Sequence, residues 1–380
     1  HIMEQLEVDW KYSDALQAAD NEKQVKYIVR DIFRLHGLDV TFMAKPMEGV
    51  AGSGEHTHLG LAAKLRDGRV VSMFSSKDGR DFLNVIGYGA LMGILNNYEV
   101  INPFISATND AFNRLKPGFE APVCTVTSMG HSVEAPSRNR TVLAGLIREA
   151  GNPLATRFEL RSPNPNSNTY LVIAASYMAM LDGIRAAVTA GKTPAELEKS
   201  ISKKKGEEDF YLETGREYRS EKDVFAHYTP EERDDIFGRP PETVWENITA
   251  FDKYPEKLEI FKSGGVMTDI VLESYREAIV NQWATELYNR IIPNAMDTVR
   301  SCRKLHNESA TDYDIGMWAK ISAQRDKIAK NTMNKFCILK KISDALDKAD
   351  YNLASRLQLE AQREIRKLID MYSSYKRNLL

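Results

Sequence analysis

Two histidines stand two residues apart in a segment whose hydrophobic pattern alternates. His56 and His58 lie in the run His56-Thr-His58-Leu-Gly-Leu61, and the alternation predicts a strand. Successive side chains of a strand point to opposite faces, so we expect both imidazoles on one face. Paired neutral imidazoles suit a divalent cation or a phosphate group, although an isolated pair is more often structural. The glycines of the preceding Gly52-Ser-Gly54 favour the functional interpretation, because such a turn exposes backbone N–H groups to an anion.

A second alternating segment, Arg157-Phe-Glu-Leu-Arg161, places two arginines and Glu159 on one strand face. On an exposed sheet these side chains would form a ladder of ion pairs. On a concave face the guanidinium groups would bind carboxylate or phosphate oxygens, and the carboxylate would hold Mg²⁺. Further arginines, Arg114, Arg138 and Arg140, lie in a loop-rich stretch nearby. The set indicates a site for a polyphosphate and a carboxylate substrate.

The elements that must position these side chains can be predicted from periodicity and from turn residues. We expect helices over 13–36, 80–99, 169–188, 241–262 and 268–292, strands over 39–43, 56–61 and 157–161, and a hairpin turn at 66–69. The stretch 102–140 is rich in proline and is expected to form loops. Residues 196–240 are charged and aperiodic, which predicts a solvated insertion.

Composition limits the classes of protein to consider. The 380 residues carry 51 Lys and Arg against 53 Asp and Glu, a net charge of −2, so the surface as a whole does not attract nucleic acid or anionic lipid. The sequence lacks the unbroken run of roughly 18 apolar residues that would span a bilayer, and we expect no membrane contact. Three cysteines without paired spacing predict reduced thiols and a cytoplasmic location.

The C-terminal region has a different character from the rest. All 14 prolines lie at or before Pro293, and residues 300–380 hold 17 Lys and Arg against 10 Asp and Glu. We therefore predict one domain over 1–293 and a basic helical extension over 294–380. The last helix carries an apolar stripe at three- and four-residue spacing: Leu353, Leu357, Ala361, Ile365, Leu368 and Tyr372. The stripe predicts packing on the chain's own domain or on a partner subunit, and we favour contacts between subunits; interleaved acids make nucleic acid an unfavoured partner.

Five motifs follow one another in the order found in glutamine synthetases, and the chain resembles that family from about residue 4 to residue 291. The motifs are Phe42-Met-Ala-Lys-Pro46, Gly52-Ser-Gly-Glu-His-Thr-His58, Arg114-Leu-Lys-Pro-Gly-Phe-Glu-Ala-Pro122, Arg138-Asn-Arg140 and Arg157-Phe-Glu-Leu-Arg-Ser-Pro-Asn-Pro165. The resemblance implies an α+β fold of the glutamine synthetase/guanido kinase-like type, with an antiparallel sheet flanked by helices. It also implies ATP-dependent ligation of ammonia to the γ-carboxylate of glutamate through γ-glutamyl phosphate.

The resemblance assigns roles to single residues, with Mg²⁺ or Mn²⁺ as cofactor and ATP as co-substrate. Glu7 would bind the substrate-side cation, and His56 with Glu159 the nucleotide-side cation. His58 would contact the ATP phosphates, which Arg140 and Arg157 would clamp.

The same resemblance assigns the glutamate subsite. Arg114 and Arg161 would bind the carboxylates of glutamate beside the backbone of Gly52. Glu120 would shield the acyl phosphate from water and help to deprotonate ammonium, and Arg140 would also stabilise the transferring group.

Several positions depart from the family pattern. Ala51 stands where the family has asparagine, Gly60 where it has serine, and Gly145 where it has a phosphate-binding arginine. If the following segment is helical, Arg148 is one turn away and could replace that arginine. These departures leave open a ligase that uses a polyamine or another amine, or a non-catalytic regulatory or assembly module of the same fold.

The resemblance also leaves part of the family's pattern unmatched. The N-terminal β-grasp domain and the first strands of the catalytic domain have no counterpart in these residues. We therefore expect the C-terminal portion of a larger protein, inactive by itself, whose intact form is a homo-oligomer with active sites between subunits.

Overall fold

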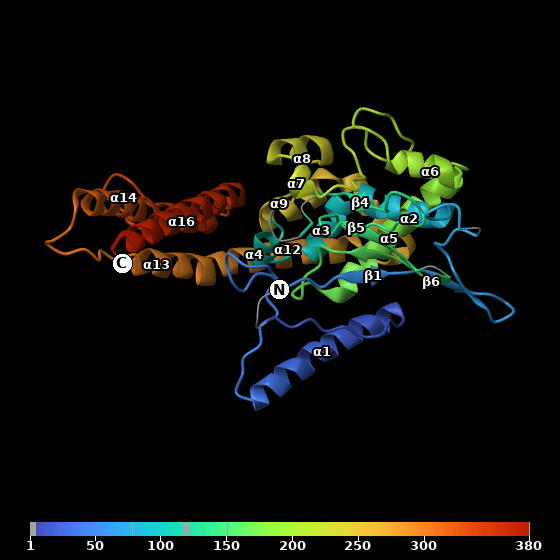
Figure 1. Ribbon diagram of the computed structural model, residues 1–380, viewed down its shortest axis with the longest axis horizontal. Helices are drawn as coiled ribbons and strands as arrows, with labels where there is room; N and C mark the ends of the chain where they lie inside the picture. The colour runs from blue at the N-terminus through green and yellow to red at the C-terminus, as the bar shows by residue number, and fades with distance from the viewer. Residues whose placement is uncertain (1–4, 78, 117–120, 123, 150, 380) are drawn as a thin grey trace. The chain divides into compact units, whose positions relative to one another are not determined.

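The computed structural model describes residues 5–77, 79–116, 121–122, 124–149 and 151–379. The chain forms two compact units. The first unit comprises His1–Pro241 and Thr249–Leu272, and the second comprises Glu242–Ile248 and Glu273–Leu380. Figure 1 shows the ribbon coloured along the chain, and each unit is described by itself below.

The first unit contains helices and short strands in mixed order. Its strands are β1 (Thr57–Leu59), β2 (Ala62–Lys64), β3 (Val70–Ser72), β4 (Thr127–Ser128), β5 (Ala144–Glu149) and β6 (Asn152–Leu160). Its helices are α1 (Ala15–Leu35), α2 (Val85–Asn96), α3 (Tyr98–Ile105), α4 (Asn109–Arg114), α5 (Thr169–Thr189), α6 (Pro194–Ile201), α7 (Val224–His227), α8 (Pro230–Phe237), α10 (Ala250–Lys253), α11 (Pro255–Lys262) and the 3₁₀ turn η1 (Ser263–Gly265).

A four-stranded sheet in the order β1-β6-β5-β4 carries the predicted site segments. β6 pairs antiparallel with both β1 and β5, whereas β4 pairs parallel with β5. The expected mainly antiparallel sheet is thus present, with one parallel pair at its edge. β2 and β3 form the predicted hairpin, in which Gly68 adopts the positive φ of 86° that the turn requires.

Helices α2 and α5 pack backbone to backbone through glycines. A Cβ at Gly93 would overlap the carbonyl oxygen of Ala179, and one at Gly183 would overlap that of Gly89. α5 is long and apolar enough to cross a membrane by length and composition alone, but many of its side chains, Ala175 and Ala179 among them, are buried inside the unit. It therefore has the character of a core helix.

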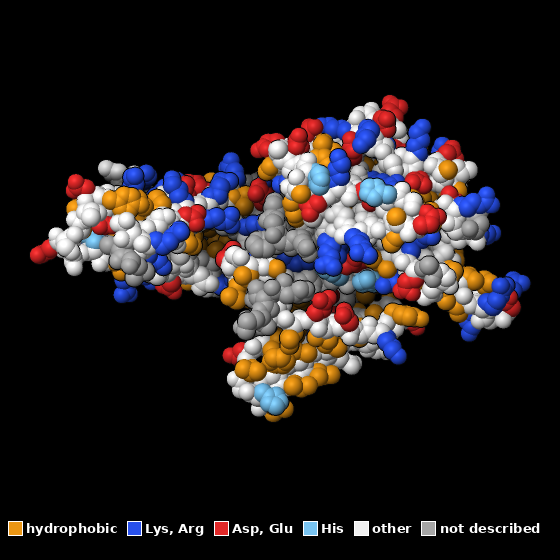
Figure 2. Space-filling model, in the orientation of Figure 1, with side chains coloured by type: hydrophobic (Ala, Val, Ile, Leu, Met, Phe, Trp, Pro, Cys, Tyr) orange, Lys and Arg blue, Asp and Glu red, His pale blue; other side chains and the backbone are white. Residues whose placement is uncertain are grey.

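The predicted first helix is confirmed as α1, but it buries little of its surface. Of its residues only Ala19 and Glu22 are fully buried, and Figure 2 shows hydrophobic side chains gathered over this helix. The large exposed ones are Leu16, Tyr27, Ile28, Ile32 and Leu35.

Some predictions were wrong. Residues 39–43 form no strand, and the loop-rich stretch 102–140 contains α4 and the second half of α3, because Pro103 is accommodated inside a helix. The segment 196–240, predicted to be solvated, contains α7, α8 and most of α6. It also buries large side chains completely or nearly so, among them Tyr218, Val224 and Phe237.

The named elements of the second unit, in its described residues, are all helices. It contains α9 (Val244–Ile248), most of α12 (Asp269–Glu286), the π-helical turn η2 (Leu287–Ile291), α13 (Ile292–Ser301), α14 (Asp312–Ala329), α15 (Ile338–Asp347) and α16 (Tyr351–Leu379). Trp283 is 1% exposed and stacks on Trp245 with ring centroids 6.1 Å apart, while its Nε1 donates to Gln358.

The apolar stripe of the last helix faces this unit's own helices. Leu357, Ala361 and Leu368 are buried where α16 packs against α14 and α15. The stripe is therefore used within the chain, and it gives no support to the contacts between subunits that its pattern suggested.

Candidate functional site

Strand pairing brings the histidine segment and the arginine segment together. In the β1–β6 ladder His58 lies directly opposite Glu159, although the two residues are about 100 positions apart in the sequence. On the other side of β6, Gly145 of β5 lies opposite Glu159. Glu159 is thus flanked across the sheet by an imidazole and by a residue without a side chain.

The carboxylate of Glu159 is held in its charged form. One oxygen, Oε1, accepts from Nη1 of Arg161 at 2.7 Å and lies 3.1 Å from Nδ1 of His56. Burial by itself would raise the pKa of Glu159, but His56, Arg161 and His58 outweigh it and lower the pKa to about 2. The carboxylate is therefore ionised throughout the neutral range.

Two atoms beside this ion pair keep lone pairs for a ligand. His56 precedes β1 rather than lying in it, and because its Nδ1 donates to Glu159, its Nε2 is left as an acceptor. Oε2 of Glu159 has no hydrogen-bond partner among the described residues and lies on the side of Gly145, where a Cβ would be 3.8 Å away. An imidazole nitrogen and a carboxylate oxygen are donors that suit Mn²⁺ or Mg²⁺. Within the described ranges, however, no group of three or more His, Cys, Asp or Glu is gathered.

His58 is fixed in a neutral tautomer by its neighbour on β6. Nε of Arg157 donates to Nδ1 of His58 at 2.9 Å, so the imidazole proton is on Nε2. Loss of surrounding water lowers the pKa of His58; the Glu159 carboxylate opposes this, and the charges of Arg157 and His56 add to it. The neutral imidazole can therefore donate Nε2–H to an anionic oxygen.

The arginines at the end of β6 and in the loop before β5 are connected through the backbone. Arg161 is 8% exposed, and its Nε donates to the carbonyl of Arg140 at 3.0 Å. Arg138 and Arg140 are exposed, whereas Asn139 between them is half-buried. The loop therefore carries two exposed arginines, and its backbone is bonded to Arg161 of the Glu159 cluster.

Arg114 is a buried cation under the glycine-rich segment. It is 5% exposed and donates to the backbone carbonyls of Ser162 and Arg161 at 2.9 and 3.0 Å. Burial, and next the charge of Arg161, lower its pKa to about 10. A Cβ at Gly52 would overlap the Ala44 carbonyl oxygen, so the close approach of this loop to Arg114 requires glycine.

The roles assigned to Glu7 and Glu120 are not tested by this cluster. Glu7 is exposed in a segment without regular structure, although its neighbour Gln5 donates to the Gly52 carbonyl at 3.1 Å. Glu120 lies outside the described residues. The structure therefore gathers the nucleotide-side residues and Arg114, and leaves the assignments of Glu7 and Glu120 as predictions.

The proposed substitute for the missing arginine is not in place. Residues 144–149 form strand β5 rather than a helix, so the spacing argument for Arg148 fails. Its Nη1 donates to the Val133 carbonyl at 3.2 Å. Gly145 itself leaves space beside Glu159.

Sequence reasoning missed an ion cluster that anchors the glycine-rich segment. Lys26 of α1 lies 3.2 Å from Glu55, forms an ion pair with Glu22, and donates to the Pro165 carbonyl at 2.5 Å. Burial raises the pKa of Glu55, and the charge of Lys26 opposes this effect. The i, i+4 spacing of Glu22 and Lys26 on a predicted helix is the sequence pattern that could have indicated this cluster.

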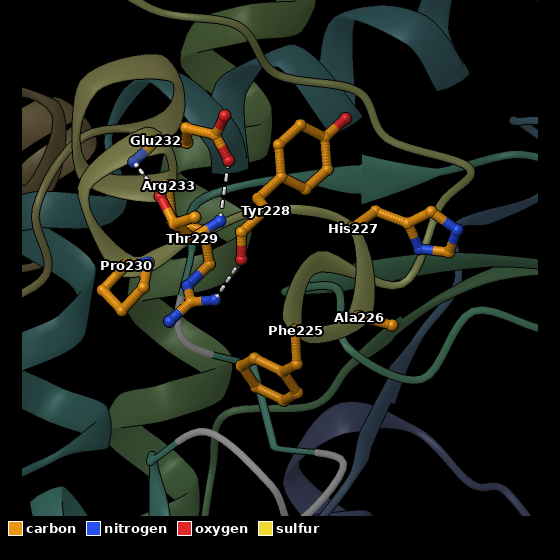
Figure 3. A pocket seen from close by; sticks show the side chains of 8 residues that line it. All are labelled: Phe225, Ala226, His227, Tyr228, Thr229, Pro230, Glu232 and Arg233. Carbon is orange, nitrogen blue, oxygen red and sulfur yellow. Dashed lines mark hydrogen bonds between the residues drawn. The ribbon is translucent and has the colours of Figure 1, made fainter.

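An open pocket of about 540 Å³ lies elsewhere in this unit, around the turn between α7 and α8. Figure 3 shows its lining, in which Arg233 donates to the Tyr228 carbonyl at 2.8 Å. None of the residues assigned from the sequence lines it. The pocket is therefore separate from the Glu159 cluster.

Comparison with known proteins places this geometry in context. Residues 2–215 match a family model described as glutamine synthetase, catalytic domain. Similar curated proteins include the glutamine synthetases of Clostridium saccharobutylicum, 37% identical over 201 residues (52% of this chain and 40% of the relative), and Thermotoga maritima, 35% identical over 197 residues (52% and 41%). Another is that of Pyrococcus horikoshii, 36% identical over 181 residues (48% and 37%). The chain thus spans about two-fifths of the length of these relatives.

Proposed function

The chain belongs to the glutamine synthetase catalytic-domain family, and on that premise we propose that it supplies the nucleotide and cation side of an ATP-dependent glutamate–ammonia ligase. The observation that carries the proposal is the Glu159 cluster, where β1 and β6 bring an ionised carboxylate, two imidazoles and two arginines together. The arrangement is of the glutamine synthetase/guanido kinase-like type.

His56 and Glu159 would hold the cation, with Mg²⁺ or Mn²⁺ as the metal. Their facing atoms, Nδ1 of His56 and Oε1 of Glu159, are 3.1 Å apart, close enough for one cation to replace the hydrogen bond between them. A divalent ion held there would supply positive charge against the phosphoryl group in transfer. ATP phosphates provide oxygen donors in addition to these two protein donors.

The nucleotide phosphates lie against His58, Arg157 and Arg140. His58 donates Nε2–H to a phosphate oxygen, because Arg157 occupies its Nδ1. Arg157 itself retains N–H groups beyond this bond, and Arg140 stands exposed on the neighbouring loop. Guanidinium groups suit the equatorial oxygens of a phosphoryl group in flight.

Glutamate binds through its carboxylates at Arg114 and Arg161, beside the backbone of Gly52. Its γ-carboxylate oxygen attacks the γ-phosphorus of ATP and ADP leaves; ammonia then attacks the acyl carbon, and phosphate leaves. Glu120 accepts a proton from ammonium and shields the acyl phosphate from water. Glu7 binds a second, substrate-side cation.

The assembly that carries out the whole reaction is a cytoplasmic homo-oligomer with sites between subunits. All three cysteines are free and buried, as reduced thiols would be. Because the described residues bring only two protein donors to the cation, we expect no glutamine synthesis by these 380 residues alone. ATP- and glutamate-dependent formation of glutamine by this chain would contradict that expectation.

Calorimetric titration of the 380-residue chain with MnATP tests the proposal. Replacing Glu159 by Gln removes the charge and should weaken binding by roughly 10- to 100-fold, since the donor set loses its only carboxylate. The matched control is Glu364→Gln, because Glu364 of α16 is likewise ion-paired, with Lys327 at 2.7 Å, but lies in the second unit. A wild-type chain that binds no MnATP, or an E159Q variant that binds as tightly as E364Q, would refute the proposal.

A further inference from the structure

The loop that carries Arg138 and Arg140 is anchored by the residue between them. The amide of Asn139 donates from Nδ2 to the carbonyls of Lys222 at 2.8 Å and Ser220 at 3.3 Å. Its Oδ1 accepts from the backbone N–H and the hydroxyl of Thr141 at 2.9 and 2.7 Å. One side chain thus joins the arginine loop to residues 219–224, some 80 positions later.

Residues 219–224 form a platform beside the edge strand of the sheet. Thr127 of β4 accepts at its carbonyl from Ser220 N–H at 3.0 Å and donates its own N–H to the Tyr218 carbonyl at 2.8 Å. The N–H of Val224 donates to the hydroxyl of Thr141 at 3.0 Å. The platform is therefore bonded both before and after the arginine loop.

Glu221 fixes the point where the chain leaves β4 towards that loop. Its carboxylate accepts from the backbone N–H groups of Met129 and Gly130 at 3.1 and 3.0 Å, and from the hydroxyl of Ser128. Nε of Arg219 donates to it at 2.8 Å. Burial alone would raise the pKa of Glu221, but these hydrogen bonds lower it, so the carboxylate stays charged.

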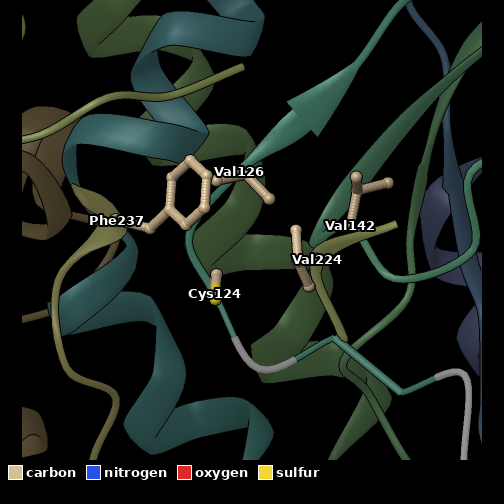
Figure 4. Packing of buried hydrophobic residues seen from close by; sticks show 5 residues of the cluster. All are labelled: Cys124, Val126, Val142, Val224 and Phe237. Carbon is tan, nitrogen blue, oxygen red and sulfur yellow. The ribbon is translucent and has the colours of Figure 1, made fainter. Parts of the chain in front are cut away.

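Apolar packing supports the same junction. Figure 4 shows Val126, Val142 and Val224 packed together with Cys124 and Phe237. Val126 precedes β4, Val142 follows the arginine loop, and Val224 ends the platform. All three valines are fully buried, so the three segments share one small core.

We propose that Asn139 and Glu221 are positioning residues that hold the arginine loop against the 219–224 platform in the geometry that binds nucleotide phosphates. Neither residue touches the nucleotide; each acts through the backbone that carries Arg138 and Arg140. The inference rests on the proposed function, because it takes that loop to contact ATP. It extends the site to a segment of the chain in which the sequence predicted no function.

Titration of the 380-residue chain with MgATP, and separately with inorganic tripolyphosphate, tests the inference. Asn139→Asp keeps the size of the side chain but replaces its donor by an oxygen, and Glu221→Gln puts an amide where four donors converge. Each variant should bind both probes on the order of tenfold more weakly, because a displaced loop loses preorganised phosphate contacts. The control is Glu217→Gln on the same segment, where Glu217 pairs with the exposed Lys204 at 3.0 Å.

Thermal unfolding separates positioning from stability. A Glu221→Gln or Asn139→Asp variant with the melting temperature of the Glu217→Gln control but weaker binding of both probes supports the inference. Binding equal to that of the control overturns it while leaving the proposed function intact. A wild-type chain that binds neither probe overturns the inference and the proposed function together, because the arginine loop then binds no phosphate.

Discussion

Two pairs of buried polar side chains in the second unit bond to each other, whereas the buried Arg114 of the candidate site bonds to backbone carbonyls. In the second unit Thr243 pairs with Ser355 at 2.7 Å, and Trp283 with Gln358 at 2.9 Å. In the first unit the buried guanidinium of Arg114 donates to backbone carbonyls and has no carboxylate partner among the described residues. Polar side chains that hydrogen-bond to each other stabilise a fold, whereas a buried charged side chain without an oppositely charged partner is a candidate for binding a ligand.

The largest expected effect on this comparison comes from the aromatic core of the second unit. Trp283→Ala should cost about 3–5 kcal/mol of unfolding free energy, because it removes a fully buried ring and leaves Gln358 without its donor. Denaturant unfolding followed by tryptophan fluorescence measures this loss, with the exposed Ile369→Ala on α16 as a control that changes little. The affinity for MgATP should be unchanged. A loss of affinity in the same variant would show that the second unit also contributes to nucleotide binding.

Two glycine substitutions should have opposite signs in the two units. Gly93→Ala should destabilise the first unit by about 3 kcal/mol, because its Cβ would overlap the Ala179 carbonyl where α2 and α5 touch. Gly316→Ala should stabilise the second unit by roughly 0.5–1 kcal/mol, since Gly316 lies in α14 with open space around the added methyl group. Urea unfolding of both variants measures the sign of each change in unfolding free energy. Equal changes would contradict the difference between the close backbone contact at Gly93 and the open space around Gly316.

The smallest expected effect is a change in the titration of His58. Its pKa lies below the ordinary 6.5 because of desolvation first and the Arg157 and His56 charges next, with Glu159 opposing them. The unfolded chain therefore takes up this proton first, and the stability that comes from a neutral His58 is lost as pH falls from about 6.5 through the lower folded pKa. Arg157→Ala removes a cation and the hydrogen bond to Nδ1, so the pKa should rise, as an NMR titration of the imidazole would measure. An unchanged or lower value would mean that Arg157 does not set the tautomer.

The sequence predicted the parts of the site that depend on period-two alternation. Alternation predicted each of the two strands, and the structure pairs them so that His58 contacts Arg157 and lies opposite Glu159; the spacing within each strand did not predict that pairing. The role of Asn139 could not be predicted, since it depends on a segment some 80 residues away with no periodicity of its own. The condition set for Arg148, a helical segment, is not met because residues 144–149 form β5 and pair with β6, a long-range interaction that the local sequence does not reveal.

The division into units follows the same logic. Helical periodicity predicted the helical extension and its last helix, α16, which packs on α14 and α15 of the same C-terminal region. It did not predict that residues 242–248 join the second unit, because seven residues carry too little pattern to reveal a distant partner.

The segment 242–248, which belongs to the second unit although the first unit resumes after it, limits how this protein can be truncated or fused. The polypeptide enters the second unit at Glu242, returns to the first at Thr249, and leaves again after Leu272. Two residues of this segment, Thr243 and Trp245, bond to Ser355 and Asn352 of the final helix. A stop codon after Pro293 would therefore remove the hydrogen-bond partners of the segment that contains α9, a helix some 50 positions upstream. The last 87 residues cannot be deleted or fused as an independent folding unit.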